Sequence, residues 1–399
     1  MICAGCSPTV TQHPIDNLLE SAANEGKVPG VIGIAANSEG IIYQGVSGKS
    51  DIARGSDLAI DSLLQIYSMT KPVTSVAVMQ LVEQGKVELD VAAATYLPML
   101  NRVQVLDGFD DGQNPVLRPP QSAVTVRQLL THTSGYVYEI WNANAAEYAS
   151  TGQVPSILAG DDGFLAAPLA FDPGTRWEYG INTDILGVLV ATVSGKTLEQ
   201  YFSENIFQPL KMHNTSFYLS EQTLQDLATM YARTDQGELS PLPAPENSAF
   251  LSGGGGLVST APDYIRFLRA LLNGGELDGG RILKPETINL MAQNHIGELE
   301  AGSSYGTQMP TFSNAFDMFP GSVDKFGLGF LINGDQVPGG RAPGSLAWAG
   351  LANTYFWIDL ENQVCGVLMT QVLPFFDAES LSVLSDFETA IYKQVLKTH

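Results

Sequence analysis

The distribution of β-rich segments along this chain of 399 residues constrains its fold more than any other feature. Two short apolar runs, 31–36 and 41–46, flank a turn-forming segment at 37–40, which predicts a hairpin. Strand signals become sparse from about 90 to 245. They return after about 250, at residues 326–332, 345–348, 354–360 and 364–371. Amphipathic helices are expected near both ends of the chain. This order predicts an α+β fold (an α/β sandwich), with an antiparallel sheet flanked by the N- and C-terminal helices and an inserted, mainly helical lobe.

The same distribution sets the expected domain boundaries. We expect residues 1–90 and 247–399 to form the α/β sheet domain, and residues 91–246 to form the mainly helical domain. Because pockets favour such junctions, the active site is expected where the two domains meet.

Composition limits the classes of partner. With 44% hydrophobic residues the chain can bury a large core, and its formal net charge of −22 argues against nucleic acid or an anionic membrane as a partner. No apolar run approaches the roughly 18 residues that a membrane helix needs, and the N-terminus has no signal-peptide pattern. We therefore expect a cytoplasmic protein, for which neutral or cationic small molecules are better tolerated as partners. Its oligomeric state stays open.

Cysteine and histidine usage gives little indication of a metal. Cys3 and Cys6 form a CxxC pair and Cys365 is isolated, whereas a structural zinc site needs four ligands. The five histidines are scattered along the chain. We expect no metal and no organic cofactor.

Ser68 and Lys71 place a hydroxyl and an amine three residues apart, where a helix is expected to begin. Side chains at this spacing face each other on a helix. Pro72 falls in the first turn, where proline is tolerated, and an apolar periodic run follows. The helix N-terminus favours developing negative charge, and the nearby amine can take the serine proton. This pattern indicates acyl transfer.

A second pair, Ser322 and Lys325, has the same spacing, which arises by chance about once or twice in a chain of this length. It follows Pro320 and Gly321 and precedes a strand-like run, so a turn is expected there.

Two further segments carry candidate side chains. Tyr179 follows a turn and precedes a strongly apolar helix-like run, so its side chain can project into a cleft, although a packed aromatic has the same signature. Trp348, Ala349 and Gly350 lie between strand-like runs, where an aromatic beside small residues in a sheet is the simpler interpretation.

Together these pieces resemble the serine β-lactamase and penicillin-binding-protein superfamily, and within it the class C-like branch called family VIII carboxylesterases. The resemblance covers almost the whole chain. Its supporting segments are 65–72 around Ser68, Leu129-Leu130-Thr131-His132-Thr133-Ser134-Gly135, the turn from Pro173 to Tyr179, and Gly253-Gly254-Gly255-Gly256-Leu257-Val258-Ser259-Thr260.

Carried over position by position, the resemblance implies Ser68 as the acylated nucleophile, Lys71 as its proton partner and Tyr179 as general base and acid. The backbone N–H groups of Ser68 and Leu351 would form the oxyanion hole. Unperturbed tyrosine and lysine titrate near 10, so activity at neutral pH requires a pKa shift of about three units. We expect an ammonium at Lys71 beside a stabilised phenolate at Tyr179, but the two groups titrate as a coupled pair, and which of them carries the proton stays open.

Two departures from the family pattern bear on the substrate. Class C β-lactamases usually carry Tyr-x-Asn, but the third position here is Ile181; Asn182 comes one place late, and Asp184 resembles the aspartate of many family VIII esterases. Ile181 and Asp184 are therefore expected to contact the substrate.

The second departure replaces the usual Lys-Thr-Gly with Trp348, Ala349 and Gly350, which are expected to line the substrate site. Losing the lysine removes a cation that helps receive a substrate carboxylate, and an aromatic wall suits a neutral ester better. The resemblance thus implies a serine carboxylesterase for small, short-chain acyl esters.

Other functions stay open. The same site could serve a β-lactamase, a D-Ala-D-Ala peptidase or an acyltransferase, and the chain could be a non-catalytic penicillin-recognising binding protein.

Ser304 lies in a Gly-x-Ser-x-Gly segment that matches the nucleophile elbow of α/β-hydrolases. That fold requires the catalytic histidine to follow the serine in the sequence, and the only histidine after Ser304 is His399. Residues 253–256 lack the Lys-Ser/Thr of a phosphate loop, and His132 is expected to be a hydrogen-bonded turn residue.

Overall fold

The computed structural model describes residues 13–395, and its centre is one antiparallel sheet of eight strands in the order β14-β15-β16-β17-β18-β1-β2-β3. In that order the strands span Lys325–Phe326, Leu331–Ile332, Leu346–Gly350, Thr354–Asp359, Val364–Met369, Gly30–Asn37, Ile41–Asp51 and Ser56–Asp57. Strand β1 pairs with β18, with Ile34 opposite Val367. The two ends of the chain therefore meet in the middle of the sheet.

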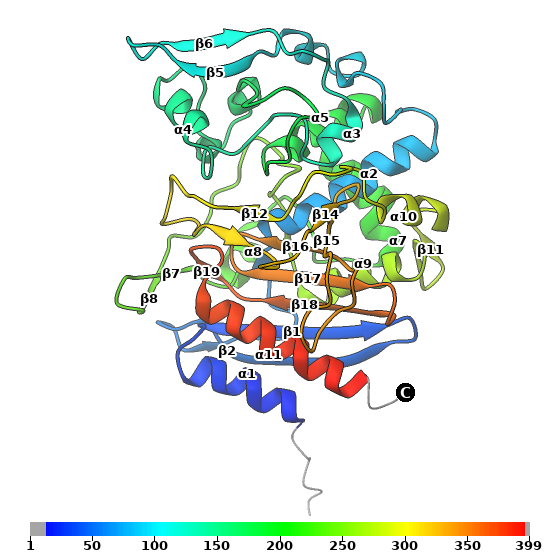
Figure 1. Cartoon of the computed structure of the whole chain (residues 1–399). Coiled ribbons are helices and arrows are strands. Elements are labelled where there is room, and N and C mark those ends of the chain that lie inside the picture. Colours follow the sequence, from blue (N-terminus) through cyan, green and yellow to red (C-terminus); the bar gives the residue numbers. More distant parts are fainter. Residues whose placement is uncertain (1–12, 396–399) are drawn as a thin grey trace, which may run out of the picture.

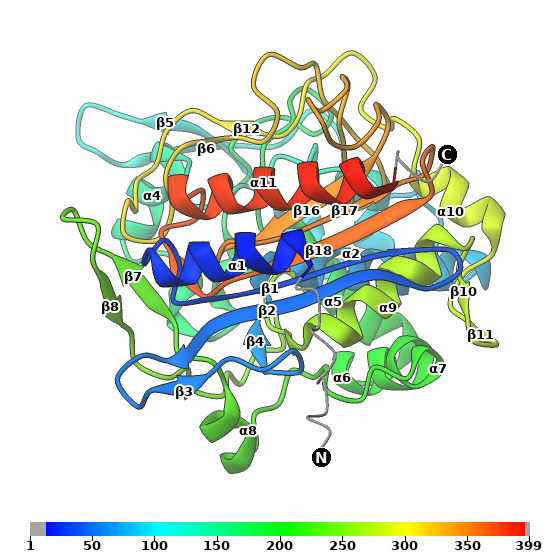
Figure 2. The same cartoon turned by 90° about the horizontal axis from the view of Figure 1, so that it is seen from below.

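The terminal helices cover one face of this sheet. Helix α1 (Pro14–Asn24) lies beside α11 (Ala378–Val395), and Figures 1 and 2 show both helices extending roughly along the strands that they cover. The ring of Phe387 on α11 lies where a side chain on Gly33 would be, since a Cβ on Gly33 would come within 2.7 Å of it. Helix α9 (Ala261–Leu272) is strongly amphipathic, and its apolar face packs on β1, β17 and β18.

Helix α2 (Thr70–Glu83) is buried along nearly its whole length, from Thr70 to Leu81. A helix with apolar residues all round is stable only inside a protein, and α2 packs against α5 (Asn182–Ser194) and α6 (Leu198–Phe202). A 3₁₀ turn, η1 (Tyr67–Met69), leads into α2 and contacts β16. The start of α2 is therefore fixed at one end of the sheet.

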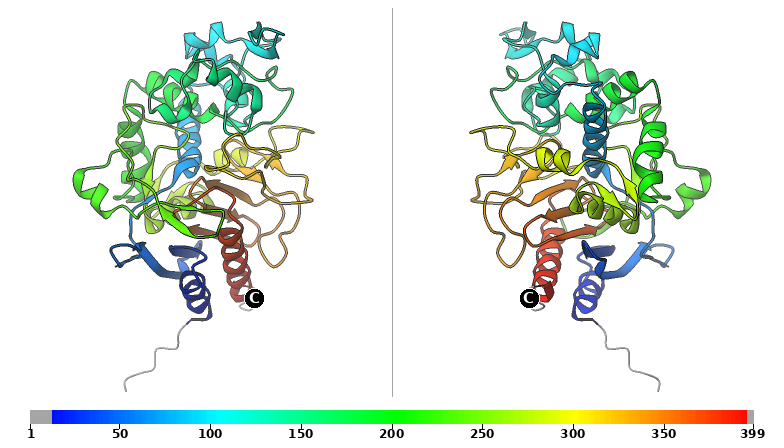
Figure 3. Two further views of the ribbon diagram at one scale, coloured as in Figure 1. Left: turned by 90° about the vertical axis from the view of Figure 1, so that its left-hand side faces the viewer. Right: turned by 90° about the vertical axis from the view of Figure 1, so that its right-hand side faces the viewer.

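The middle of the chain divides between two places: residues 93–150 gather at one end of the molecule, whereas residues 208–241 lie beside the sheet, as the cyan and green segments show in Figures 1 and 3. Its helices are α3 (Val126–Leu130), α4 (Ala143–Ser150), α5, α6, α7 (Gln208–Leu210) and α8 (Glu221–Asp226), with short 3₁₀ or π turns at Ala93–Thr95, Pro98–Arg102, Ile157–Ala159, Gly163–Ala166 and Ser203–Phe207. It also holds the hairpin of β5 (Val105–Phe109) and β6 (Pro115–Arg118), and β7 (Tyr231–Arg233) with β8 (Leu239–Pro241).

Short pairings tie the remaining segments together. Strand β7 pairs with β19 (Val372–Leu373), and β4 (Leu64–Gln65) pairs with β9 (Val258–Ser259). Further two-stranded pieces are β10 (Glu276–Leu277) with β11 (Gly280–Arg281), and β12 (Ser303–Ser304) with β13 (Phe316–Asp317), and α10 (Pro285–Met291) lies between them in sequence.

The predicted fold class is confirmed, with both terminal helices on the antiparallel sheet and a mainly helical insertion. One predicted strand, 326–332, is instead two short strands, β14 and β15, joined by a tight turn in which Gly327 N–H donates to Phe330 O. The boundaries at 90 and 246 stay a prediction. Cys3, Cys6 and His399 lie outside the described residues. Within residues 13–395, no helix is long and apolar enough to cross a membrane.

Phe387→Ala tests how much the contact of α11 with the sheet contributes to stability. Phe387 is fully buried and also contacts the rings of Tyr43 and Trp357. Replacing a buried phenylalanine with alanine costs about 3–5 kcal/mol. We therefore expect a clearly lower urea midpoint, whereas Asp386→Ala at the neighbouring exposed position should leave it within error. Equal midpoints for the two variants would contradict this packing.

Candidate active site

Ser68 lies in η1, directly before α2, and its side chain is only partly buried. The residue before it, Tyr67, has a positive φ of 40°, which non-glycine residues adopt rarely and at a cost in backbone energy. Two bonds fix the turn that follows: Tyr264 OH donates to Met69 O (2.9 Å), and Leu257 N–H donates to Thr70 Oγ1 (3.1 Å). The hydroxyl of Ser68 is thereby presented at the end of the helix.

Lys71 is buried, with 2% of its surface exposed, and its Nζ donates three hydrogen bonds. The acceptors are Ser68 Oγ (3.2 Å), Tyr138 OH (3.0 Å) and Gly254 O (2.7 Å). A Cβ on Gly254 would come within 2.4 Å of the Asp184 carboxylate, so a side chain at this position would displace that carboxylate. The glycine-rich segment 253–256 thus shapes the wall beside Lys71.

Tyr179 lies on the opposite side of the serine. Its hydroxyl donates to Ser68 Oγ at 2.6 Å, and Lys71 Nζ lies 4.7 Å from the centre of its ring. The indole of Trp348 packs against the same ring at 4.8 Å between centroids and donates from Nε1 to Tyr179 OH at 3.4 Å. The structure therefore brings Ser68, Lys71 and Tyr179 together around one hydroxyl oxygen, with Trp348 beside them.

A cavity of about 280 Å³ opens at Ser68. Its lining consists of Ser68, Trp141, Tyr179, Phe316, Met318, Trp348, Ala349, Gly350, Leu351 and Phe375. A Cβ at Gly350 would come within 2.3 Å of Ile66 O, so glycine lets the end of β16 lie against the turn that carries Ser68. The sequence candidates Trp348, Ala349, Gly350 and Leu351 all lie in the wall of this cavity together with Ser68.

Asp184 occupies a different place from the predicted one. It is fully buried on the first turn of α5, and Ser252 Oγ (2.5 Å), Gly254 N–H (3.0 Å) and Tyr138 OH (3.4 Å) donate to its carboxylate. It does not belong to the lining of the serine cavity. Asp184 therefore lies behind Lys71, where it contacts the groups that hold the amine.

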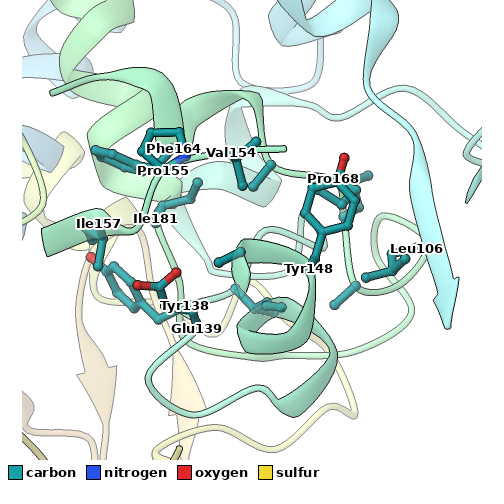
Figure 4. Close-up of a pocket in the computed structure, with 16 residues that line it drawn as sticks. Leu106, Tyr138, Glu139, Tyr148, Val154, Pro155, Ile157, Phe164, Pro168 and Ile181 are labelled. Carbon is teal, nitrogen blue, oxygen red and sulfur yellow. The ribbon is translucent and has the colours of Figure 1, made fainter. Parts of the chain in front are cut away.

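Ile181 and Asn182 also point away from the serine cavity. Ile181 lines a separate apolar cavity of about 490 Å³, where Figure 4 shows it beside Tyr138 and Glu139. Asn182 Nδ2 donates to Tyr136 O (3.0 Å) and lies 2.9 Å from the Nδ1 of His132. Asn182 therefore stabilises the loop after α3 through buried contacts with His132 and Tyr136.

Burial determines the protonation of the site. It lowers the pKa of Lys71 to about 7, although the negative charge of Asp184 raises it. Burial also raises the pKa of Tyr179 above its ordinary value, and the hydrogen bonds with Ser68 and Trp348 only partly oppose this rise. This direction opposes the expected stabilisation of a phenolate at Tyr179, because a buried phenol is favoured in its neutral form. The amine is the group that titrates near neutrality.

The other candidate positions are placed outside this arrangement. Ser304 lies in β12 and donates to Gly306 O at 3.4 Å, whereas Ser322 Oγ donates to Asp324 Oδ1 at 2.7 Å in a turn. Lys325 donates to Leu299 O. His132 is buried in the loop after α3, and burial holds its pKa well below the usual range.

Sequence reasoning missed Tyr138, which bonds to Lys71, and the aromatic wall formed by Trp141, Phe316 and Phe375. Tyr138 lies three residues beyond the 129–135 segment, so that segment could have indicated it. Trp141 and Phe375 come from loops and Phe316 from the two-residue strand β13, all without a recognisable motif. Among the described residues, no three His, Cys, Asp or Glu side chains cluster as metal ligands would.

The family model described as Beta-lactamase matches residues 15–384. Lovastatin esterase of Penicillium rubens is 30% identical over 95% of this chain and 98% of its own length. Monacolin J acid methylbutanoyltransferase of Aspergillus terreus is 30% identical over 95% of both chains.

Solved structures agree with these relatives. Unliganded simvastatin synthase from Aspergillus terreus superimposes with a TM-score of 0.82 at 30% identity, covering 95% of this chain and 97% of that one. EstCE1, described as a hydrolase with promiscuous acyltransferase activity, shares the fold with a TM-score of 0.74 at 24% identity, with coverages of 95% and 97%. The predicted superfamily and the predicted enzyme of the serine hydrolase type are confirmed, and the chain belongs to the β-lactamase family.

Proposed function

We propose that the protein is a serine carboxylesterase that hydrolyses small, neutral, short-chain acyl esters through an acyl-enzyme on Ser68. The observation that carries the proposal is the position of Ser68 Oγ, 3.2 Å from the amine of Lys71 and 2.6 Å from the phenol of Tyr179. A serine hydroxyl becomes a nucleophile when a base of suitable pKa lies within hydrogen-bond distance. Near pH 7 that base is Lys71.

Acylation then proceeds with the two proton carriers in separate roles. Lys71 accepts the proton of Ser68 as Oγ bonds to the ester carbonyl carbon, and negative charge develops on the carbonyl oxygen. The neutral phenol of Tyr179 donates its proton to the leaving alkoxide as the carbon–oxygen bond breaks. The ammonium of Lys71 then restores the phenol, so the free alcohol departs and no net charge is left on the enzyme.

The backbone N–H groups of Ser68 and Leu351 are assigned to the oxyanion. Both residues line the serine cavity, and the start of α2 adds the favourable end of a helix dipole. Preorganised donors of this kind lower the barrier because they require no reorganisation as charge develops. Water entering the cavity completes the cycle, losing its proton to the same carriers as it attacks the acyl-enzyme.

Acyl transfer to an alcohol is the second candidate, favoured by a specific observation. A relative at 30% identity over 95% of this chain carries the name of an acyltransferase. An alcohol would replace water in the second step and use the same residues. Product analysis with an added acceptor alcohol separates the two, because transfer yields a new ester.

The wall of the cavity supports neutral esters over penicillins. Trp348 stands where the family pattern has a lysine, and none of the residues lining the serine cavity is a lysine or arginine. A substrate carboxylate would therefore lose its water without gaining a cation, which is costly. The same argument disfavours the β-lactamase and D-Ala-D-Ala peptidase alternatives.

Ser68→Ala tests the nucleophile. With a panel of p-nitrophenyl esters from acetate to decanoate, we expect the variant to lose at least about 1,000-fold in kcat/KM, and mass spectrometry of the wild type to find the acyl group on Ser68. Ser304→Ala is the matched control and should retain wild-type rates. A wild type without an adduct on Ser68 would favour the non-catalytic binding protein.

Nitrocefin tests the substrate class on the same preparation. Because the serine cavity has no cation for a β-lactam carboxylate, we expect its turnover to be at least about 100-fold slower than that of p-nitrophenyl acetate. Comparable rates for the two compounds would overturn the preference for neutral esters while leaving the role of Ser68 intact.

Asp184→Asn tests the role of Lys71 through pH. With a pKa of about 7, Lys71 is protonated at lower pH and cannot take the serine proton, so kcat/KM should fall on the acidic side. The negative charge of Asp184 raises that pKa, so removing it should move the acidic limb to lower pH. The ratio of rates at pH 6 and pH 8 should therefore rise, and Asp386→Asn on the surface should leave it unchanged. An unmoved limb, or one at higher pH, would contradict the assignment.

A further inference from the structure

A second, larger hollow begins where the serine cavity ends. It is a groove of about 1240 Å³, open to solvent, between the loops 317–322 and 335–341 and one side of α11. Met318 lines both spaces. The rings of Phe316 in the serine cavity and Phe376 in the groove pack at 6.3 Å between centroids, so the two hollows adjoin at these residues.

The two hollows differ in what they can hold. The serine cavity is much the smaller of the two, with about 280 Å³ of empty space against about 1240 Å³ in the groove. It has room for a short acyl group, whereas an ester also carries an alcohol half that needs space of its own. That space has to adjoin the cavity without displacing a group that the reaction uses.

Met318 is suited to separate two parts of one binding site. Its backbone is held in place because its N–H donates to Gly302 O at 3.0 Å, while its side chain is half-buried. Methionine has three rotatable bonds and adapts its shape to neighbours at low cost. The side chain can therefore turn aside for a substrate while the loop stays in place.

The cavity behind Tyr138 does not offer the same route. Figure 4 shows Tyr138 in its wall, and the hydroxyl of this residue accepts a hydrogen bond from Lys71. The ring of Tyr138 also packs against that of Tyr179 at 5.1 Å. A substrate arm passing this way would have to displace a tyrosine bonded to the catalytic amine.

The groove is chemically suited to an apolar chain without negative charge. Its apolar lining residues are Met318, Phe319, Pro320, Val337, Pro338, Phe376, Leu381 and Leu384. Arg341 on its floor is already paired, since its Nε donates to Glu388 at 2.8 Å. The carboxylates of Asp317 and Asp335 then disfavour an anionic arm. Between Leu381 and Glu388 the groove follows α11 for about 10 Å.

We propose that this groove, which we call the α11 groove, binds the alcohol arm of the substrate, and that Met318 determines how long an arm is accepted. The inference rests on the proposed esterase function of Ser68. The acyl group has to stay in the serine cavity with its carbonyl in the oxyanion hole until water attacks. The alcohol half needs further space, and the larger α11 groove supplies it directly beside that cavity. The preferred substrates are short-chain acyl esters of long, neutral, apolar alcohols.

Acetate esters of lengthening alcohols, from ethyl to octyl, test the inference when hydrolysis is followed by acid release. A buried methylene is worth up to about fourfold, so octyl acetate should exceed ethyl acetate in kcat/KM by at least about tenfold in the wild type. Ser385→Trp places a large ring on an exposed residue that lines the groove and should lower that octyl-to-ethyl ratio about fivefold or more. Met318→Ala opens the divider and should raise it.

Ser382→Trp is the matched control, because Ser382 is exposed on the same helix and lies outside the groove lining. It should keep the wild-type ratio. In a parallel series of p-nitrophenyl esters with lengthening acyl chains, Ser385→Trp should leave the length dependence unchanged.

An octyl-to-ethyl ratio that Ser385→Trp leaves unchanged would overturn the inference, and so would a loss confined to long acyl chains. In both cases p-nitrophenyl acetate would still acylate Ser68, so the proposed function would stand. If the wild type forms no adduct on Ser68, the proposed function itself fails, and the groove assignment fails with it.

Discussion

The burial of one amine governs the chemistry of this protein. Lys71 lies out of water between a backbone carbonyl, a phenol and the hydroxyl of Ser68, and no carboxylate forms a direct salt bridge with it in the described structure. Neutral acceptors offset only part of the cost of burying a charge, so the pKa of the amine falls to about 7. A lysine exposed to solvent would stay protonated near pH 7 and could not take a proton from serine.

The rest of the fold excludes water from the amine of Lys71 and leaves Ser68 partly exposed. Helix α2 carries both groups through the protein interior, α5 brings Asp184 against the wall formed by Gly254, and the end of β16 presses against the turn before Ser68. Glycines at positions 254 and 350 allow these approaches, because a Cβ at either position would collide with its neighbours. Segments from distant parts of the sequence therefore meet at the Oγ atom of Ser68. The central sheet, in which β1 pairs with β18, supports them.

The sequence predicted the fold class and the central trio because both depend on local patterns. The hairpin, the final strands and the terminal helices have strong periodicity, and Ser68, Lys71 and Tyr179 lie in motifs of fixed spacing. Side-chain direction was harder to predict. Ile181 is the third residue of the expected motif and Asp184 follows it closely, yet Ile181 lines a separate cavity and Asp184 contacts Tyr138 and Gly254. Tyr138 comes from a loop, and Phe316 and Met318 come from the short strand β13 and the loop after it, whose paths depend on tertiary packing. The spacing of the motifs carries no information about burial, so it could not decide which of Lys71 and Tyr179 carries the proton.

The most direct test of this account is the titration of the Lys71 amine itself, followed by NMR on protein labelled with ¹⁵N at the lysine side chains and assigned with Lys71→Arg. The account predicts an amine that loses its proton near pH 7. An amine that stays protonated up to about pH 10, as an exposed lysine does, would contradict the claim that burial makes Lys71 the base for Ser68.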